Sequence, residues 1–360
     1  MPERVFNEQL LVLARDSRGM TQADLASNSG VTQAYISKLE NRLIDKPSDE
    51  TVQLLAKALG YQEAFFYNDE RRQALPPFHH RKRSRLSKRT LSRIEALVDI
   101  DRMRAERLFR SYEEEPVWNL PTYGRQGITC SPEEAARHLR EAWRVAKGPI
   151  GNLTRLVQEA GVVVIELDFQ TTDWDGVSSR YKGTPPIVFL NSRTPGDRRR
   201  FTLAHEIGHL MLHDGQKDVG VYKSDAEKES EANDFAAEFL APAREIKRYL
   251  MYPKLDKLAR TKVYWGVSIK ALIYRCKTLN LVTDWQYKRL LINYNKAGYN
   301  RAEPFPLVQE KSAGLSSVIR YHLQKLKYSK EDLASLLWIY NLEDLKELYE
   351  HGPSLQLVKG

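Results

Sequence analysis

The sequence predicts an α+β protein that is mostly helical, with an N-terminal five-helix bundle, a central domain containing a small sheet, and a helical C-terminal region. Apolar residues recur at helical spacing through most of the 360 residues, and capping residues precede many of the predicted helices. The strand-like runs that we identify, at 162–165, 173–181 and 186–191, all lie in the middle of the chain. Proline-containing breaks at 76–77 and 304–306 separate the three parts.

The composition excludes several classes of protein. With 42% hydrophobic and 29% charged residues, the chain can bury cores and stay soluble. It has no apolar run of the roughly 18 residues that a membrane span needs, and its first residues do not resemble a signal peptide. Two cysteines, Cys130 and Cys276, are far apart in the sequence and favour a reducing, cytoplasmic location. The net charge of +9 permits nucleic-acid binding.

Residues 1–68 predict a helix-turn-helix bundle. Helices are expected at 6–17, 22–27, 33–41 and 48–59, and the turn between the second and third contains a glycine. Two short helices separated by such a turn form the arrangement in which the second helix enters the major groove of DNA. The alternative is a helical bundle used for dimerisation or protein contact.

This segment resembles the XRE family of helix-turn-helix domains, of the Cro and phage-repressor type. The residues that carry the resemblance are 20–26, 30–41 and 54–60. It implies binding as a homodimer to a palindromic operator in double-stranded DNA, with Gln22 at a phosphate and the second helix at base edges. The implied DNA-binding residues are Gln22, Thr32, Gln33, Ala34, Tyr35, Ser37 and Lys38.

Residues 69–150 are interpreted as a basic and helical connector. The run from Arg81 to Arg93 holds seven Lys or Arg and no acid. It either follows DNA phosphates or forms a solvated tether, and the sequence does not decide between them. A helix is predicted at 90–112, and a second one begins after Ser131, an N-cap, and runs to about Val145.

The segment from His205 to His209 has the pattern H-E-x-x-H. Two histidines four residues apart on a helix face the same way, so both can bind one Zn²⁺ while Glu206 activates a metal-bound water. Leu203, Ala204, Ile207 and further apolar neighbours predict that this helix is buried. Buried polar groups need partners, and a metal ion provides one.

A third zinc ligand is expected 20 residues after His209. On a helix, Glu229 shares a face with small residues that allow close packing, whereas Glu231 shares a face that we expect to be exposed to solvent. We therefore favour Glu229. The rival His213 is rotated by about 80° from His205, so we expect it to support the site rather than bind the metal.

Two further features concern the substrate of such a site. Pro185 and Pro186 predict that the third strand begins near a sheet edge. The helix that carries His205 and His209 is called the metal helix below. An edge strand beside it is a natural place for an extended peptide to pair. Tyr181 and His213 are the candidates for assisting the oxyanion of peptide hydrolysis, and the sequence does not choose between them.

The metal segments together resemble the ImmA/IrrE family of metallopeptidases. The resemblance rests on 200–213, 229–242, 265–268 and 271–275, and it covers about residues 150–305. Ala241 departs from the family, which often has Met there. The resemblance implies a zincin-like metallopeptidase domain at 151–305, which includes a helix-turn-helix-like subdomain at about 246–300. The implied zinc ligands are His205, His209 and Glu229, with Glu206 as catalytic base.

Residues 306–360 predict further helices whose role the sequence leaves open between sensing a signal, dimerisation and covering the core. The whole pattern favours a DNA-bound, nucleoid-associated regulator that is also a zinc endopeptidase. Its protein substrate would be a repressor, an antitoxin-like partner or the protein itself. The competing hypothesis is a non-proteolytic transcription factor or antitoxin with a structural or latent zinc site. Glu206 favours the enzyme, because a structural site needs no base.

Overall fold

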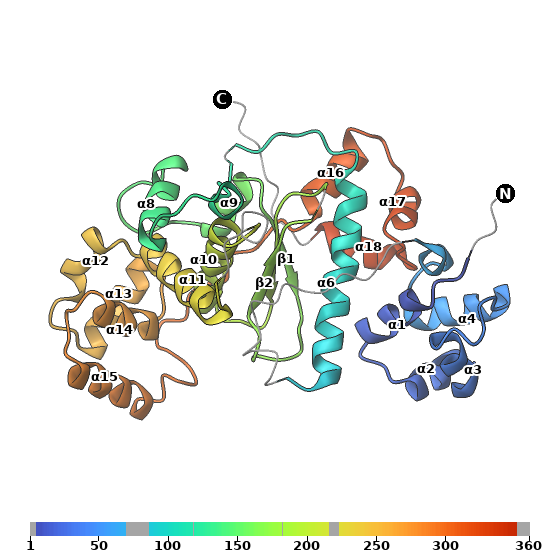
Figure 1. Ribbon diagram of the computed structural model, residues 1–360, viewed down its shortest axis with the longest axis horizontal. Helices are drawn as coiled ribbons and strands as arrows, with labels where there is room; N and C mark the ends of the chain where they lie inside the picture. The colour runs from blue at the N-terminus through green and yellow to red at the C-terminus, as the bar shows by residue number, and fades with distance from the viewer. Residues whose placement is uncertain (1–4, 70–85, 118, 182, 216–222, 351–360) are drawn as a thin grey trace.

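The computed structural model describes residues 5–69, 86–117, 119–181, 183–215 and 223–350 (Figure 1). These residues are mostly helical and contain one three-stranded sheet, so the predicted fold class is confirmed. Of the helices described, none combines the length and the apolar character needed to cross a membrane.

The N-terminal bundle forms as predicted, with four α-helices and a 3-10 helix. Thr21 caps the second helix in a reciprocal capping box with Asp24, and Gly30 ends it with φ at 75°. A positive φ at this turn favours glycine, because a side chain would be strained there. The helices are α1 (Glu8–Ser17), α2 (Gln22–Ser29), α3 (Gln33–Glu40), α4 (Asp49–Leu59) and η1 (Glu63–Tyr67).

Helix α6 (Lys88–Phe109) lies between this bundle and the sheet (Figure 1). One of its faces, with Ile100 and Met103, completes the core of the bundle. The other face, with Val98 and Leu108, joins the core under the sheet. A helix that is apolar on two sides therefore packs against both domains.

The last residues of the basic run form the first turns of α6. Residues 81–85 lie outside the described residues. In the first turns of α6, Arg89 donates a 2.8 Å hydrogen bond to the carbonyl of Gly19, and Arg93 donates one of 3.0 Å to the carbonyl of Asp168. This part of the run therefore belongs to a folded helix that contacts both domains.

The sheet contains β1 (Val163–Leu167), β2 (Gly176–Ser179) and β3 (Ile187–Asn191) in the order β1-β3-β2. Strand β3 runs parallel to β1 and antiparallel to β2, so it is central. The expectation that the third strand begins near a sheet edge was wrong. Every residue of β3 is buried, and Pro186 lies just before the strand, where its missing N–H does not interrupt the pairing. The edge strand beside the metal helix is β2.

Helices cover both faces of the sheet. On one face lie α10 (Gly196–Leu212) and α9 (Leu153–Glu159), with α11 (Asp225–Leu240), α8 (Pro132–Ala142) and α7 (Tyr123–Gln126) behind them. On the other face α6 packs with three C-terminal helices. These are α16 (Ser316–Gln324), α17 (Lys330–Leu336) and α18 (Leu342–Glu350). This packing supports a core-covering role for the C-terminal region.

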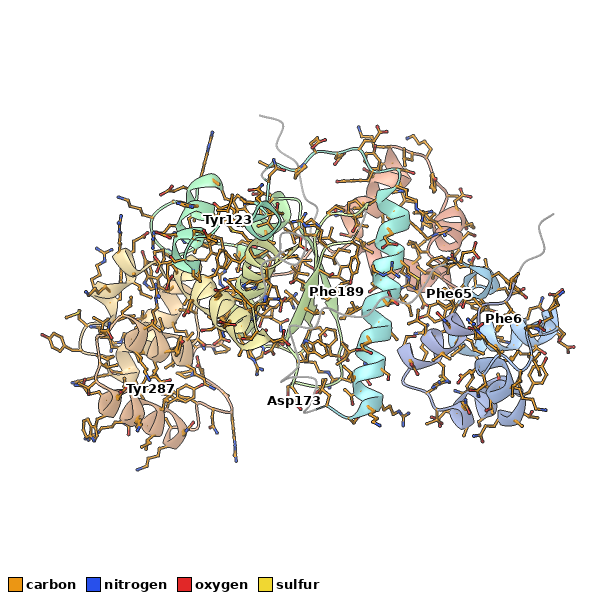
Figure 2. All side chains as sticks on the ribbon, in the orientation of Figure 1. Phe6, Phe65, Tyr123, Asp173, Phe189 and Tyr287 are labelled. Atoms are coloured by element: carbon orange, nitrogen blue, oxygen red, sulfur yellow. The ribbon has the colours of Figure 1, made fainter. Side chains whose placement is uncertain are left out.

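The C-terminal region also contacts the N-terminal bundle. Tyr61 and Ile339 form an isolated β-bridge. The ring of Phe65, which is labelled in Figure 2, meets the ring of Trp338 edge-on at 5.4 Å. At the far end of the molecule, four short helices occupy the segment where we expect the helix-turn-helix-like subdomain, and they share the hydrophobic core that contains α10. They are α12 (Ala243–Leu250), α13 (Leu255–Trp265), α14 (Ile269–Thr278) and α15 (Asp284–Lys296).

Candidate metal centre

Close packing of α10 on α11 brings the candidate ligands together. Gly208 faces α11, and a Cβ at this position would lie 3.0 Å from the Phe235 ring and 3.3 Å from the Cα of Ala232. A larger residue would therefore push the helices apart. Because Gly208 lies between His205 and His209 on α10, the close approach places Glu229 of α11 opposite both imidazoles.

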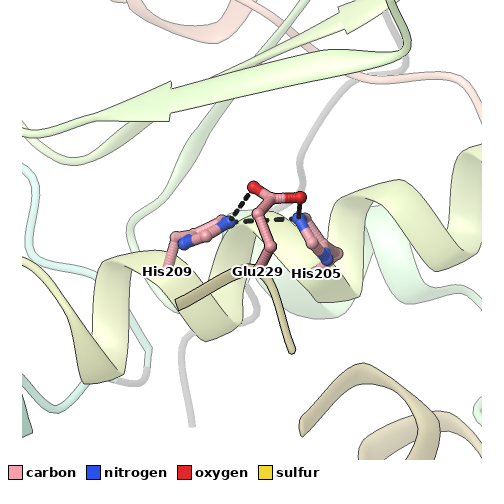
Figure 3. Close-up of side chains that lie close together, drawn as sticks. All are labelled: His205, His209 and Glu229. Carbon is pink, nitrogen blue, oxygen red and sulfur yellow. Dashed lines mark hydrogen bonds and ion pairs between the residues drawn. The ribbon is translucent and has the colours of Figure 1, made fainter. Parts of the chain in front are cut away.

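Donor atoms of three side chains converge at this contact (Figure 3). Nε2 of His209 lies 3.0 Å from Nε2 of His205 and 3.2 Å from Oε1 of Glu229, and Nε2 of His205 lies 3.7 Å from Oε2 of Glu229. Nitrogen ligands about 2.0–2.1 Å from a tetrahedral zinc lie about 3.3 Å apart, so the spacing fits one ion. The residues that the sequence favours as ligands are thus brought together.

Hydrogen bonds fix which nitrogen of His205 faces the ligand cluster. Its Nδ1 lies 3.1 Å from Oδ1 of Asn233. An amide oxygen only accepts, so Nδ1 carries the proton and Nε2 keeps its lone pair. Outer hydrogen bonds of this kind orient metal-binding histidines in many proteins.

A longer chain of hydrogen bonds determines which nitrogen of His209 faces the other ligands. Oε2 of Glu231 lies 2.8 Å from Nε2 of His213, whose Nδ1 lies 2.9 Å from Nδ1 of His209. The carboxylate accepts from His213, so His213 must accept from the Nδ1–H of His209. This leaves Nε2 of His209 unprotonated and turned to the other ligands. Lys223 pairs with Glu231 at the outer end.

The buried side chains also have the charge states that a metal needs. Burial lowers the pKa of His209 to about 3, so its imidazole is neutral. Burial acts to raise the pKa of Glu229, but its close contacts with His205 and His209 outweigh burial and hold that pKa below its usual range. The hydrogen bond from His213 lowers the pKa of Glu231 to about 2. Neutral imidazoles with an ionised carboxylate match a zinc site.

The expectation that the Glu231 side of α11 is exposed was wrong. Phe235 is fully buried on this side and Glu238 is 2% exposed, because α8 packs across it. Glu238 is compensated there by Arg275. Glu231 itself is half-buried, with His213 and Lys223 as partners. Buried ion pairs make an acidic helix face compatible with burial, which a polarity pattern alone does not reveal.

The candidate base is held by a residue that the sequence analysis did not select. Ser178 of β2 donates a 2.6 Å hydrogen bond to Oε2 of Glu206. Two residues further, Arg180 pairs with Asp214, which follows the metal helix, at 2.9 Å. Alternation along the strand puts both side chains toward α10. The sequence contained one sign of this arrangement, because the polar residues Ser178 and Arg180 are two positions apart and so share one face of a strand.

The same alternation places Tyr181 on the other face of the sheet. It packs against the core formed by α6 and the C-terminal helices, with its ring 5.6 Å from the guanidinium of Arg102. The structure therefore does not bring Tyr181 to the ligand cluster. Of the two candidates for assisting the oxyanion, His213 lies at the cluster but is bonded to His209 and Glu231.

The candidate DNA-binding residues lie on and beside α3. Gln33, Ala34 and Lys38 are exposed, whereas Tyr35 and Ser37 are half-buried. Thr32 caps the helix by accepting from the backbone N–H of Tyr35 at 3.3 Å. Gln22 donates to Glu40 at 2.8 Å, and Glu40 also accepts from Arg15.

Comparison with protein families gives two matches. Residues 11–66 match the model described as helix-turn-helix, and residues 157–277 match the Peptidase M78 model, described as an IrrE N-terminal-like domain. No curated protein matches the chain. The first match covers most of the N-terminal bundle, and the second covers the sheet and the ligand cluster. Both agree with the resemblances in the sequence.

Proposed function

We propose that this chain, which joins a helix-turn-helix domain to an IrrE N-terminal-like domain of a metallopeptidase family, is a DNA-binding regulator and a zinc endopeptidase. Its substrate is a regulatory protein: a repressor, an antitoxin-like partner or the protein itself. It binds a palindromic operator as a homodimer, as helix-turn-helix domains commonly do. The convergence of His205, His209 and Glu229 beside buried Glu206 is the observation that carries the proposal.

The roles of the residues follow from the contacts. A Zn²⁺ held by the three ligands would polarise the peptide carbonyl and lower the pKa of the attacking water to about 7. Glu206 accepts the proton of that water on its carboxylate and passes it to the leaving amine. Ser178 positions this carboxylate through Oε2. His213 and Glu231 position His209.

The substrate backbone pairs with β2. This strand is an edge of the sheet and contacts α10, so an extended peptide added to it lies beside the ligand cluster. Main-chain hydrogen bonds to an edge strand give affinity without requiring a particular side chain. The arrangement therefore suits an endopeptidase that acts on an exposed segment of a folded protein.

The competing function is a regulator or antitoxin that never cleaves and has a structural or latent zinc site. A structural site requires ligands only. Burying a fourth ionisable side chain beside them lowers the stability of the fold, and such burial is typical of residues with a catalytic role. The buried Glu206, with Ser178 bonded to it, therefore favours the enzyme.

One experiment separates the two functions. Zinc content and cleavage of the proteins encoded beside this one are measured for the wild type and for Glu206→Gln. The enzyme hypothesis expects equal zinc in both and cleavage by the wild type alone. Equal zinc with identical substrate integrity in both would leave the non-proteolytic regulator as the better description.

A further inference from the structure

Much of the positive charge of the chain lies in the helical subdomain that follows the metal centre. Residues 243–301 contain fourteen Lys and Arg against three Asp and Glu, a net charge of +11, which exceeds the +9 of the whole chain. The helix-turn-helix bundle differs, because residues 5–69 contain six Lys and Arg against nine Asp and Glu. The bundle by itself therefore brings little of the attraction to phosphates that provides most non-specific affinity for DNA.

Helix α15 presents part of this charge to solvent. Its inner side packs through Leu290, and the acid of its first turn, Asp284, pairs with Lys277 at 3.3 Å. On the outer side, the guanidinium of Arg289 lies 5.0 Å from the ring centre of Trp285. Three cations and no acid occur on this outer stripe. The stripe consists of the exposed residues Trp285, Lys288, Arg289, Ile292 and Lys296.

The position of α15 suits contact with DNA. Helices α14 and α15 pack together and are joined by a short turn, as α2 and α3 are. In this arrangement the second helix is the one that lies against DNA. The subdomain and the N-terminal bundle lie at opposite ends of the long axis (Figure 1), and Tyr287 marks α15 in Figure 2. The outer stripe of α15 is therefore well separated from the surface of α3.

We propose that the outer stripe of α15 binds the phosphate backbone of duplex DNA, and so adds a second DNA contact to that of α3. A row of cations without acids is complementary to phosphates, and it supplies the electrostatic attraction that the acidic bundle lacks. The inference rests on the proposed function in taking DNA as the partner. Base-specific binding by α3 is measured separately on an operator, so either contact can fail alone.

The test uses the full chain and a duplex of scrambled sequence, because phosphate contacts do not depend on sequence. Affinity is measured against salt concentration for the wild type and for Lys288→Glu/Arg289→Glu/Lys296→Glu. Three phosphate contacts contribute about 2.7 to the slope of log affinity against log salt, since each contributes about 0.9. We expect the slope to fall by about this amount and the affinity to fall at least about 10-fold at roughly 0.1 M salt.

A matched control removes the effect of total charge. Lys325→Glu/Lys327→Glu/Lys330→Glu makes the same charge change at exposed lysines around the start of α17, and it should leave the salt slope close to that of the wild type. Equal losses in the two triple variants would overturn the proposal, as would an unchanged slope in the α15 variant. Loss of poly-glutamate binding alone in the α15 variant would assign the stripe to an acidic protein segment instead.

Discussion

Ser178 on the edge strand donates a 2.6 Å hydrogen bond to Glu206 on the metal helix. Ser178 is 5% exposed and Glu206 is fully buried, so water does not compete for this bond. The bond joins the strand where we place the substrate to the residue that we assign as base. It therefore couples the position of the substrate backbone to the position of the carboxylate.

Ser178→Ala should lower kcat by about 10- to 100-fold, because a hydrogen bond to a charged group contributes about 1.5–3 kcal/mol. KM and zinc content should change little, since Ser178 binds neither substrate nor metal in our assignment. Ser178→Thr keeps the hydroxyl and should restore most of kcat. The measurements are steady-state kinetics on a cleaved partner protein and zinc per chain. A fall in zinc content with unchanged kcat per bound zinc would instead give Ser178 a purely structural role.

His213→Phe and Glu231→Gln should each weaken zinc binding by about 10- to 100-fold, the usual effect of removing a partner that orients a metal-binding histidine. His213→Phe breaks the chain of hydrogen bonds that keeps Nε2 of His209 unprotonated and directed at the other ligands, and Glu231→Gln removes the negative charge that ends this chain. Affinity is measured by competition with a chelator. Glu141→Gln, at an exposed position on α8, is the control for loss of one surface carboxylate. Wild-type zinc affinity in both variants would show that these hydrogen bonds do not support the metal site.

The stability of the metal-free protein should depend on pH through its buried histidines. Burial lowers the pKa of His209 to about 3, and it also lowers that of His213, whereas an unfolded histidine titrates near 6.5. Between these values the unfolded chain binds more protons, so the free energy of unfolding decreases as pH falls from about 6.5 toward 3. Thermal melts at pH 7.5 and 5.5 should show a lower Tm at the acidic value. His209→Gln with His213→Gln should reduce this difference, and a difference of wild-type size in that variant would contradict the assignment.

The candidate ligands could be chosen from the sequence because their convergence depends on local geometry. Two histidines four residues apart on a helix face one way, and Glu229 shares its helix face with small residues. The outer partners depend on contacts between elements. The role of Ser178 depends on the position of β2 at the sheet edge beside α10, whereas the prolines before β3 led us to expect that the third strand begins near the edge. Likewise, Ser178 and Tyr181 lie on opposite faces of the sheet only because side chains alternate along the strand.

Replacing Gln33 and Lys38 by alanine should abolish the footprint on the operator and leave cleavage by the purified protein unchanged. Both side chains are exposed on α3, the helix expected in the major groove, where glutamine pairs with adenine and lysine with guanine. Losing two such base contacts should weaken specific binding by about 2–6 kcal/mol, at about 1–3 each. Affinity for a scrambled duplex should fall far less, because phosphate contacts elsewhere remain. Lys57→Ala, an exposed position on α4, is the control. A footprint of wild-type strength in the double variant would exclude α3 as the helix that reads the operator.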